Sequence, residues 1–466
     1  MDSKNIKALL ASILLSCGLL STAGISQAET LSDIYNSALD NDPEIRAAGA
    51  VLKGQKEATR QALGGLLPQV GFSASSTHTN FENRASNSAP VTIKGTSYGL
   101  DLAQPLFNAS TWFSYKQAQT IDYKAELDFS AAQQDLIVRV AVSYFRILRA
   151  NDALLAAQAE EAAIKRQLEQ TKQRFDVGLI AITDVHEAQA AFDLSQVGRI
   201  RTQNQLDIAY EAIQAITGQQ YSSISTVKPD YPINKPQPAD PQAWADNALA
   251  GNFVLRGIEQ AVEAARQNIK VKKSGHLPVV TLFGLYLAED NDDSSSSVID
   301  FGGTPTAVSF APTDQVNKTA GIRLSLPIYS GGVTHAASKQ ATYQLTEAQE
   351  NYTLAQRKLV QQTRSLYSLV VTDILRIKAR KQAIVSTESA LKATEVGYDV
   401  GTRNIVDVLQ SQRAVYRASR DYDNARYDYV IHMLQLKQAT GQISPEDIHN
   451  INQWVDPTKN TQGKGI

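Results

Sequence analysis

The stretch RFDVGLIAITDVHEAQ, residues 174–189, is repeated without a gap in the stretch GYDVGTRNIVDVLQSQ, residues 397–412. Each copy holds one glycine, Gly178 in the first and Gly401 in the second. Glycine takes the left-handed conformation that ends a helix without steric cost. We predict that each copy is the turn of a helical hairpin and that the chain contains two such hairpins.

The residues after each glycine offer capping groups for the helix that follows. Short polar side chains at a helix start accept hydrogen bonds from backbone N–H groups that have no partner within the helix. An acidic side chain three residues later completes a reciprocal pair. We therefore predict a cap formed by Asp184 with Glu187 in the first copy and by Asn404 with Asp407 in the second.

The repeat extends over most of the chain. GLLPQV at 65–70 parallels GHLPVV at 275–280, and YGLDLAQPLF at 98–107 parallels AGIRLSLPIY at 320–329. The copies meet in a segment rich in proline, which disfavours helix. Each repeat is expected to hold two strands and one long helical hairpin. The expected domains are a signal peptide at 1–28, a first repeat at 29–227, a linker at 228–241, a second repeat at 242–455 and a disordered tail at 456–466.

The N-terminus has the pattern of an export signal, with Lys4 and Lys7 before an apolar run and Ala28 at a small-residue cleavage point. The one cysteine, Cys17, lies in this segment, and lipid attachment there is an alternative that the sequence leaves open. Lys and Arg total 45 and Asp and Glu total 47 among 466 residues. This balance gives no indication of nucleic-acid binding. No later segment is apolar over the ~18 to 20 residues that a membrane helix needs, so any membrane contact has to use strands.

Long helices are expected on both sides of each turn, because no proline lies between Pro105 and Pro229 or between Pro327 and Pro445. Apolar residues in these segments alternate four and three apart, which is the spacing of a coiled-coil seam. The first helix carries two such stripes and the second carries one: Leu136, Val140, Ser143, Ile147, Ala150, Leu154 and Ala157; Ile137, Ala141, Tyr144 and Leu148; and Ala341, Leu345, Ala348, Tyr352, Ala355 and Leu359. A helix with two stripes packs on two sides.

Four segments alternate with the period of two that is typical of strands. Their predicted apolar positions are Val70, Phe72 and Ala74; Tyr98, Leu100 and Leu102; Thr281, Phe283, Leu285 and Leu287; and Ile322, Leu324, Leu326 and Ile328. A soluble sheet with one buried face and a transmembrane barrel both have this pattern. Four strands cannot close a membrane barrel, so a barrel needs two, three or four chains, which would supply about 8, 12 or 16 strands.

The strings ITDV, VGTRNIVDVL, HLP, LSLPIYSGG and NARY, with the signal, the duplicated halves and the Pro-rich midpoint, resemble the TolC family of outer-membrane channel-tunnel proteins. The resemblance covers residues 29–450. It implies a fold that is mainly α with a β-barrel. A trimeric transmembrane barrel of about 12 strands, four per chain, would be continuous with a long α-helical coiled-coil tunnel.

The resemblance also implies a function. The chain would be an exit duct in the outer membrane of a Gram-negative bacterium, extending into the periplasm, for drug efflux and type I protein secretion. The implied partners are further copies in a homotrimer, a periplasmic adaptor (membrane fusion protein), an energised inner-membrane transporter and outer-membrane lipid. The duct would be passive, and its periplasmic end would open when the helical hairpins untwist. Neither a cofactor nor nucleic acid is implied.

Four residues match the gate of this family by position. Tyr398 and Arg403 match residues of the inner hairpin that link to the neighbouring outer hairpin, at positions that correspond to Thr183 and Asp184. An Arg guanidinium can donate to a hydroxyl or a carbonyl, and a Tyr hydroxyl can donate to a carboxylate. A helix cap is the alternative role of Asp184, and both roles can coexist.

Asp407 matches the constriction aspartate of the family. Three carboxylates around a narrow axis attract cations. The next ring inward is aspartate in the best-known member, whereas this chain has Gln410. We therefore expect weaker cation selectivity and weaker block by multivalent cations. Glu187 is a further possible source of negative charge, and it is equally a candidate for the helix cap.

No catalytic residue is expected, because no nucleophile with its base and no pair of carboxylates can be argued from the sequence. The 6 histidines lack metal-ligand spacing. The acidic run with Asp290, Asp292 and Asp293 is interpreted as a solvated loop, since it lacks the spacing of a calcium loop. Two other functions stay open on the residues alone: a periplasmic coiled-coil adaptor and a lipid-anchored periplasmic scaffold.

Overall fold

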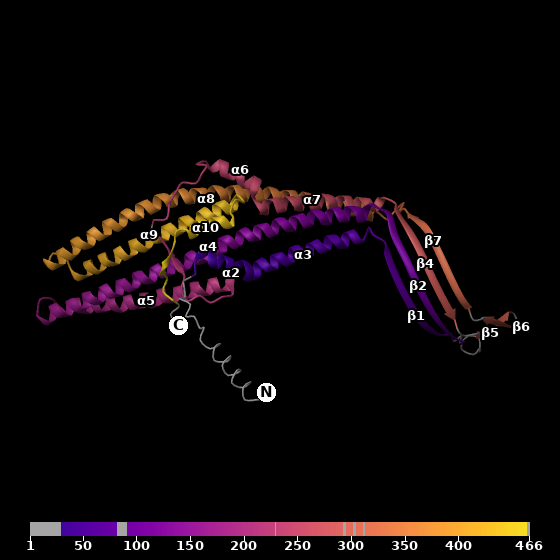
Figure 1. Cartoon of the computed structure of the whole chain (residues 1–466), viewed down its shortest axis with the longest axis horizontal. Helices are drawn as coiled ribbons and strands as arrows, with labels where there is room; N and C mark the ends of the chain where they lie inside the picture. Colours follow the sequence, from indigo (N-terminus) through magenta and orange to yellow (C-terminus); the bar gives the residue numbers. More distant parts are fainter. Residues whose placement is uncertain are drawn as a thin grey trace, which may run out of the picture. The chain divides into compact units, whose positions relative to one another are not determined.

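The computed structural model describes residues 29–81, 91–228, 230–291, 295–301, 304–310 and 313–463 (Figure 1). The predicted signal peptide, Cys17, Asp292 and Asp293 lie outside these residues. The chain divides into two compact units, and each unit takes segments from both sequence repeats. The helical unit contains residues up to Ala48, Ser130–Asn252 and the chain from Arg357, whereas the sheet unit contains Gly49–Phe129 and Phe253–Gln356. The compact units therefore do not coincide with the repeats at 29–227 and 242–455.

The sheet unit is built on four antiparallel strands in the order β1-β2-β4-β7. The strands are β1 (Gln69–Phe81), β2 (Val91–Asn108), β4 (Val279–Asn291) and β7 (Thr313–Ser325). β2 from the first repeat pairs with β4 from the second, so one sheet joins both repeats. Between β4 and β7, the strands β5 (Ser295–Phe301) and β6 (Thr304–Phe310) form a separate hairpin.

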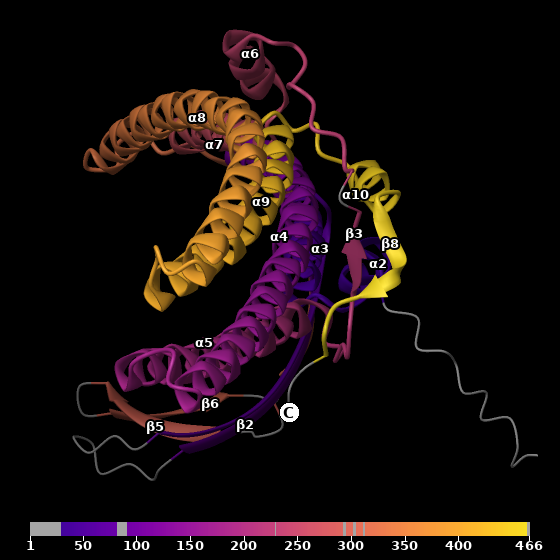
Figure 2. The same cartoon turned by 90° about the vertical axis from the view of Figure 1, so that its left-hand side faces the viewer.

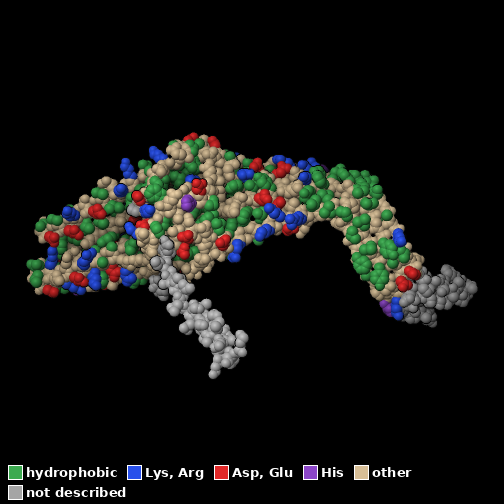
Figure 3. All heavy atoms as spheres, viewed as in Figure 1, with side chains coloured by type: hydrophobic (Ala, Val, Ile, Leu, Met, Phe, Trp, Pro, Cys, Tyr) green, Lys and Arg blue, Asp and Glu red, His purple; other side chains and the backbone are tan. Residues whose placement is uncertain are grey.

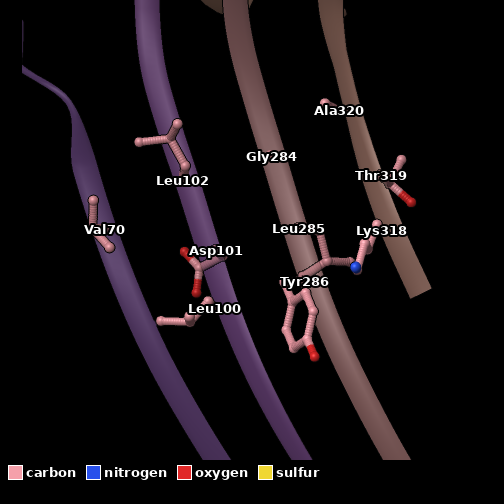
Figure 4. Close-up of a pocket in the computed structure, with 10 residues that line it drawn as sticks. All are labelled: Val70, Leu100, Asp101, Leu102, Gly284, Leu285, Tyr286, Lys318, Thr319 and Ala320. Carbon is pink, nitrogen blue, oxygen red and sulfur yellow. The ribbon is translucent and has the colours of Figure 1, made fainter. Parts of the chain in front are cut away.

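The strand register sorts the side chains of the sheet onto two faces, because directly opposed residues point the same way. One face is largely apolar and carries Val70, Phe72, Tyr98, Leu100, Leu102, Leu282, Tyr286, Ile322 and Leu324, all of them exposed in the single chain. Lys318 lies on the same face, opposite Tyr286. A shallow hollow lies on the sheet at Gly284, which presents no side chain between Leu102 and Ala320 (Figure 4). Hydrophobic side chains cover much of the strands in Figure 3. This face matches the prediction for β1 and β2.

The structure corrects the predicted face of β4. Tyr286 lies opposite Leu100, and Leu282 lies opposite Ile322, so the even-numbered residues of β4 form the apolar face. The predicted set Thr281, Phe283, Leu285 and Leu287 lies on the other face, together with Asp101 and Arg323. Both alternating sets of β4 are apolar, so the period of two could not choose between them.

On that second face, large side chains lie over glycines. Phe283 lies beside Gly321, where a Cβ would come within 3.1 Å of its ring. The Arg323 guanidinium carbon is 4.8 Å from the centre of the same ring. Arg323 therefore has an aromatic partner for its charge on this face.

The prediction for the end of β7 is also wrong. Leu326 and Ile328 were expected to continue the strand, but β7 ends at Ser325. Ser325 pairs with Val279, the first residue of β4, so no partner strand remains beyond it. Pro327 has no N–H to offer a partner strand, and Ile328 is 94% exposed.

Each strand of the sheet is connected along the chain to one helix of the sheet unit. These helices are α3 (Pro43–Gly64), the first part of α4 (Ala109–Asp176), α7 (Phe253–Lys273) followed by the 3₁₀ turn η1 (Ser274–His276), and the first part of α8 (Val333–Asp399). Helices α3 and α7 precede β1 and β4, and α4 and α8 follow β2 and β7. Polar contacts join neighbours, such as Thr59 Oγ1 to the Ala118 carbonyl at 3.2 Å and Arg256 Nη2 to the Tyr123 hydroxyl at 2.8 Å.

The helical unit contains α2 (Leu31–Asn41), α5 (Ile182–Thr217), α6 (Pro241–Gly251), α9 (Ile405–Ala439), α10 (Pro445–Asn452) and the later parts of α4 and α8. The second predicted stripe of α4, Ile137, Ala141, Tyr144 and Leu148, is at most 2% exposed, as are Leu136, Val140, Ile147 and Leu154 of the first. Of the other members of the first stripe, Ala150 is buried, whereas Ser143 and Ala157 are only partly buried. On the predicted stripe of α8 only Ala341 and Leu359 are buried in the single chain. No helix within the described ranges is long and apolar enough to cross a membrane.

The structure corrects the prediction of a disordered tail from residue 456. Residues Val455–Asn460 form β8, which pairs with β3 (Ser225–Val227) in a small antiparallel sheet (Figure 2). Thr461 beyond it is 4% exposed and shares a hydrogen bond of 2.6 Å with the Tyr210 hydroxyl. The Gln462 N–H donates to Asn151 Oδ1 at 2.8 Å. Backbone pairing and polar contacts with distant segments order this tail, although it has few apolar side chains.

Candidate functional site

Both predicted hairpin turns are present in the helical unit. α4 ends at Asp176 and α5 begins at Ile182, while α8 ends at Asp399 and α9 begins at Ile405 (Figure 1). Gly178 and Gly401 both have φ of +77°. Nothing crowds either glycine within 4 Å, so the left-handed backbone, and not a lack of space, is what favours glycine at these positions. The turn prediction is confirmed.

The two turns differ in how the following helix is capped. At α9 the Asn404 side chain accepts from the Asp407 N–H at 2.9 Å, and Asp407 Oδ2 accepts from the Asn404 N–H at 3.4 Å. This is the predicted capping box. At α5 the N-cap residue is Ala181, which has no side-chain acceptor.

The predicted cap by Asp184 with Glu187 is therefore wrong. Asp184 lies inside the first turn of α5, at the position that corresponds to Asp407, and its N–H donates to the Ala181 carbonyl at 3.2 Å. A carboxylate in a first turn is favoured by the helix dipole. Asp184 Oδ1 accepts a long hydrogen bond of 3.4 Å from Thr183 Oγ1. The Asp184 carboxylate is therefore not held in a cap.

The predicted gate residues occupy different environments. Arg403 is largely exposed, with 62% of its side chain accessible, and its Nη1 lies 3.8 Å from Asp407 Oδ2. Thr183 and Gln410 are exposed, and Asp184 is partly exposed. Tyr398 instead packs against an apolar cluster. Within the described part of this single chain, no hydrogen bond or ion pair joins Tyr398 or Arg403 to Thr183 or Asp184.

That apolar cluster brings the two hairpins of one chain together below their turns. It consists of buried Ile164, Ala191, Ile405 and Leu409, with partly buried Phe192, Tyr398 and Val406 packed against it. These residues come from α4, α5, α8 and α9. The Arg413 Nε and Glu160 Oε1 atoms lie 3.3 Å apart and add a polar contact between α9 and α4.

Sequence reasoning missed a second link between the hairpins. Arg174 Nη2 donates to Asp399 Oδ1 at 2.7 Å. The guanidinium carbon of Arg174 also lies 4.8 Å from the centre of the Tyr398 ring. The hydrogen bond to Asp399 raises the pKa of Arg174 above its usual range. Opposite charges flanking the two repeated turns were the only signal in the sequence, and such signals are common on exposed helices.

The fold defines the class of protein. Solved structures of outer-membrane channels have the same fold: CusC superposes with a TM-score of 0.75 at 18% identity, covering 91% of this chain and 95% of CusC. VceC from Vibrio cholerae gives a TM-score of 0.71 at 19% identity, covering 88% of this chain and 96% of VceC. The combination of a four-stranded sheet with two long helical hairpins is thus the fold that this chain shares with CusC and VceC.

The chain belongs to the family described as outer membrane efflux protein, whose model matches residues 34–219 and 244–442. It is similar to outer membrane protein TolC of Vibrio cholerae, with 37% identity over 93% of this chain and 95% of the relative. Identity to outer membrane protein TolC of Escherichia coli is 35%, over 97% of this chain and 90% of the relative. Alkaline protease secretion protein AprF of Pseudomonas aeruginosa is 28% identical over 90% of this chain and 85% of the relative. Its place is therefore the outer membrane of a Gram-negative bacterium.

Proposed function

We propose that the chain is the outer-membrane exit duct of tripartite drug efflux and type I protein secretion. The observation that carries this proposal is the sheet of the sheet unit. One of its faces is largely apolar, with Lys318 on that face lying 5.6 Å from the centre of the Tyr286 ring, and the outer edges of β1 and β7 have no partner strand in the described chain. Open sheet edges are not stable in hydrocarbon, where backbone groups have no water to bond. Family membership supports the same conclusion.

We propose that the assembly is a homotrimer, in which β1 of each copy pairs with β7 of the next. Three copies would close a barrel of about 12 strands, which is within the range of bacterial outer-membrane barrels. The apolar face would contact outer-membrane lipid, and the helical unit would extend into the periplasm. A barrel of this kind has no unpaired edge.

The partners follow from the same proposal. A passive duct needs an energised transporter in the inner membrane and a periplasmic adaptor that joins the two. The family description, outer membrane efflux protein, supports an efflux role, and the name of one relative, alkaline protease secretion protein, supports a secretion role. The chain would act as a conduit and not as an enzyme, and it would require no cofactor.

The hairpin ends would form the gate. The Arg403 guanidinium is exposed and makes only a long ion pair, to Asp407, among the described residues, so it is available to Thr183 or Asp184 of a neighbouring copy. The Asp184 carboxylate is not used in a cap, and this also favours such a link. Tyr398 is already covered by Arg174 of its own chain. Among the proposed links, Arg403 to the neighbouring Thr183 and Asp184 is therefore the stronger candidate.

The constriction would be formed by Asp407 and, one turn further along α9, by Gln410. The Asp407 carboxylate is partly occupied, because it completes the cap and lies near Arg403. A neutral Gln410 adds no charge to the next ring. We therefore expect only a modest preference for cations, and Asp407→Asn should reduce it further in reversal-potential measurements.

The test is single-channel conductance of the purified protein in planar bilayers. Arg403→Ser should increase conductance or open probability clearly, because one charge-assisted hydrogen bond contributes about 1.5 kcal/mol or more. Arg417→Ser is the matched control, since Arg417 is an exposed arginine of α9, the helix that follows the Arg403 turn, and has no ion pair among the described residues. Equal conductance in wild type and Arg403→Ser would remove Arg403 from the gate. Well-folded protein without conductance would favour a periplasmic adaptor instead.

A further inference from the structure

At one end of the sheet, every chain segment that passes from helix to strand lacks acidic residues. Residues 58–81, 102–121, 264–288 and 315–346 contain no Asp or Glu. All four segments belong to the sheet unit, and each contains Lys or Arg. The whole chain has nearly equal numbers of basic and acidic residues, 45 and 47. A region with charges of one sign is therefore a departure from the rest of the molecule.

Five lysines on the helices next to the sheet define what we call the basic band: Lys116, Lys270, Lys272, Lys273 and Lys339. Lys270, Lys272 and Lys273 lie in the last turn of α7 and are exposed. None of the five forms an ion pair with a described residue. By contrast, Arg60 of α3 and Arg266 of α7 are paired with Glu57 and Glu263 on their own helices.

The helix dipole does not explain the whole band. Cations in the last turn of a helix are stabilised by its dipole, and this accounts for the three lysines of α7. Lys116 and Lys339 lie instead near the starts of α4 and α8, where the dipole offers a cation no stabilisation. What these lysines have in common is that each lies within about two turns of the end of its helix that is next to a strand.

Aromatic rings lie among these lysines. Lys116 Nζ is 5.2 Å from the centre of the Trp112 ring and 5.9 Å from that of Tyr115. Lys270 Nζ is 5.8 Å from the centre of the Phe113 ring, a contact between α7 and α4. Trp112 is 48% exposed in the single chain. Exposed Trp and Tyr beside basic residues are typical of the layer where hydrocarbon meets lipid headgroups.

The distances agree with this placement. Strands of the length of β4, Val279–Asn291, extend about 43 Å at ~3.3 Å per residue, which spans about 30 Å at the tilt of a membrane barrel. That is the thickness of the hydrocarbon core, and the headgroup layer adds about 5 to 8 Å on each side. Lys273 precedes β4 by only a few residues, and Lys116 lies two turns into α4. The α7 lysines therefore fall at the depth of the headgroups, and Lys116, about 10 Å beyond the strand end, reaches that layer with its long side chain.

We propose that the basic band binds the phosphate-bearing headgroups of anionic phospholipids in the membrane leaflet at the helical end of the sheet. The lysine ammonium groups would bond to the phosphates while the aromatic rings lie at the hydrocarbon boundary. The proposal rests on the placement of the sheet in the membrane. Unpaired positive charge and the absence of repelling carboxylates favour an anionic lipid surface over a zwitterionic one.

The test compares lipid binding by two triple variants of the full-length protein. Lys270→Gln, Lys272→Gln and Lys273→Gln together remove the α7 part of the band. The matched control is Lys378→Gln, Lys381→Gln and Lys392→Gln, three exposed lysines of α8 in the helical unit. Each protein, purified in neutral detergent, is titrated with phosphatidylglycerol or phosphatidylcholine, and the lipid bound is measured together with the thermal unfolding midpoint.

The α7 variant should bind phosphatidylglycerol at least about tenfold more weakly at 0.1 M salt, and the difference should shrink at 1 M salt. Phosphatidylcholine binding and the control variant should match wild type. Equal phosphatidylglycerol binding by both triple variants would overturn the proposal. So would inorganic phosphate that raises the thermal unfolding midpoint of wild type as much as phosphatidylglycerol does. Insertion into vesicles is scored separately by flotation. If wild type does not float with the vesicles, the proposed placement of the sheet in the membrane is wrong. If the variants float and keep the lipid preference of wild type, only the proposed lipid binding by the basic band is wrong.

Discussion

Removing the Arg174 guanidinium should loosen the two hairpins of a chain from each other. Arg174 of α4 bonds to Asp399 of α8 at 2.7 Å and covers the Tyr398 ring. Arg174→Gln keeps a polar side chain of similar reach but removes the charge. The prediction is a higher open probability of the duct in planar bilayers, with little change in the thermal unfolding midpoint.

The size of the effect on gating depends on how exposed the Arg174 and Asp399 side chains are. The side chains of Arg174 and Asp399 are 36% and 66% exposed, so water and salt screen the ion pair, which contributes about 0.2 to 1 kcal/mol. The contact with the Tyr398 ring adds about 0.5 kcal/mol or more. A loss of about 1 kcal/mol per chain shifts the ratio of closed to open hairpins roughly fivefold, and three chains that open together would shift it on the order of 100-fold.

The assay uses wild type, Arg174→Gln and Arg199→Gln at 0.1 M and 1 M KCl. Arg199 is a matched control because its Nε lies 2.7 Å from Glu161 Oε2 and its side chain is 38% exposed, but the pair joins α4 and α5 of one hairpin. The effect of Arg174→Gln should decline at 1 M KCl, where the screening length falls to about 3 Å. The reasoning is refuted if Arg174→Gln gates like wild type, or if Arg199→Gln opens the duct to the same extent.

Three further predictions concern stability. Gly401→Ala should destabilise the protein by about 1 to 2 kcal/mol because φ is +77°. The control Gly198→Ala inside α5 should leave the unfolding midpoint unchanged or raise it, since no atom lies within 4 Å of the added Cβ. A lower midpoint for Gly198→Ala alone would contradict this. Burial, and then the charge of Asp152, raise the pKa of Asp423 to about 6 from 3.8. The folded state therefore binds more protons than the unfolded state between about pH 4 and 6, and stability falls as pH rises through that window. Asp423→Asn should stabilise the protein relative to wild type by an amount that grows from pH 4 to 7, to at most about 3 kcal/mol per chain, and a difference independent of pH in thermal melts would argue against this. Arg139→Met should cost about 3 to 5 kcal/mol because it leaves Asp42, whose side chain is 3% exposed, as a buried carboxylate without its partner. Denaturant unfolding should show little effect for the control Arg60→Met, whose ion pair with Glu57 is exposed, and equal losses in both variants would be the contrary result.

Local sequence signals predicted the hairpins well. The glycines at 178 and 401 mark the two turns, and the apolar stripes of α4 are buried as their spacing predicts. Both features depend on residues within a few turns of one another. Backbone conformation at a glycine and the side of a helix that is apolar are local properties, so a single sequence is enough to predict them.

The candidate site was only partly predictable. The cap at Asn404 was found, but the equivalent position in the first copy is Ala181, and the sequence offered two acidic residues that suggested a cap elsewhere. The link from Arg174 to Asp399 joins residues that are far apart along the chain. Nothing local distinguishes this pair from the other exposed charges on long helices.

By itself the sequence determined the duplication, the long helices, the two turns and four strands with apolar alternation. The tertiary structure decided which face of β4 is apolar, where β7 ends, and that the tail from Val455 is a strand paired with β3. Each of these depends on hydrogen-bond register between segments separated by many residues. In β4 both alternating sets are apolar, so only the partners Leu100 and Ile322 on the adjacent strands could assign the faces.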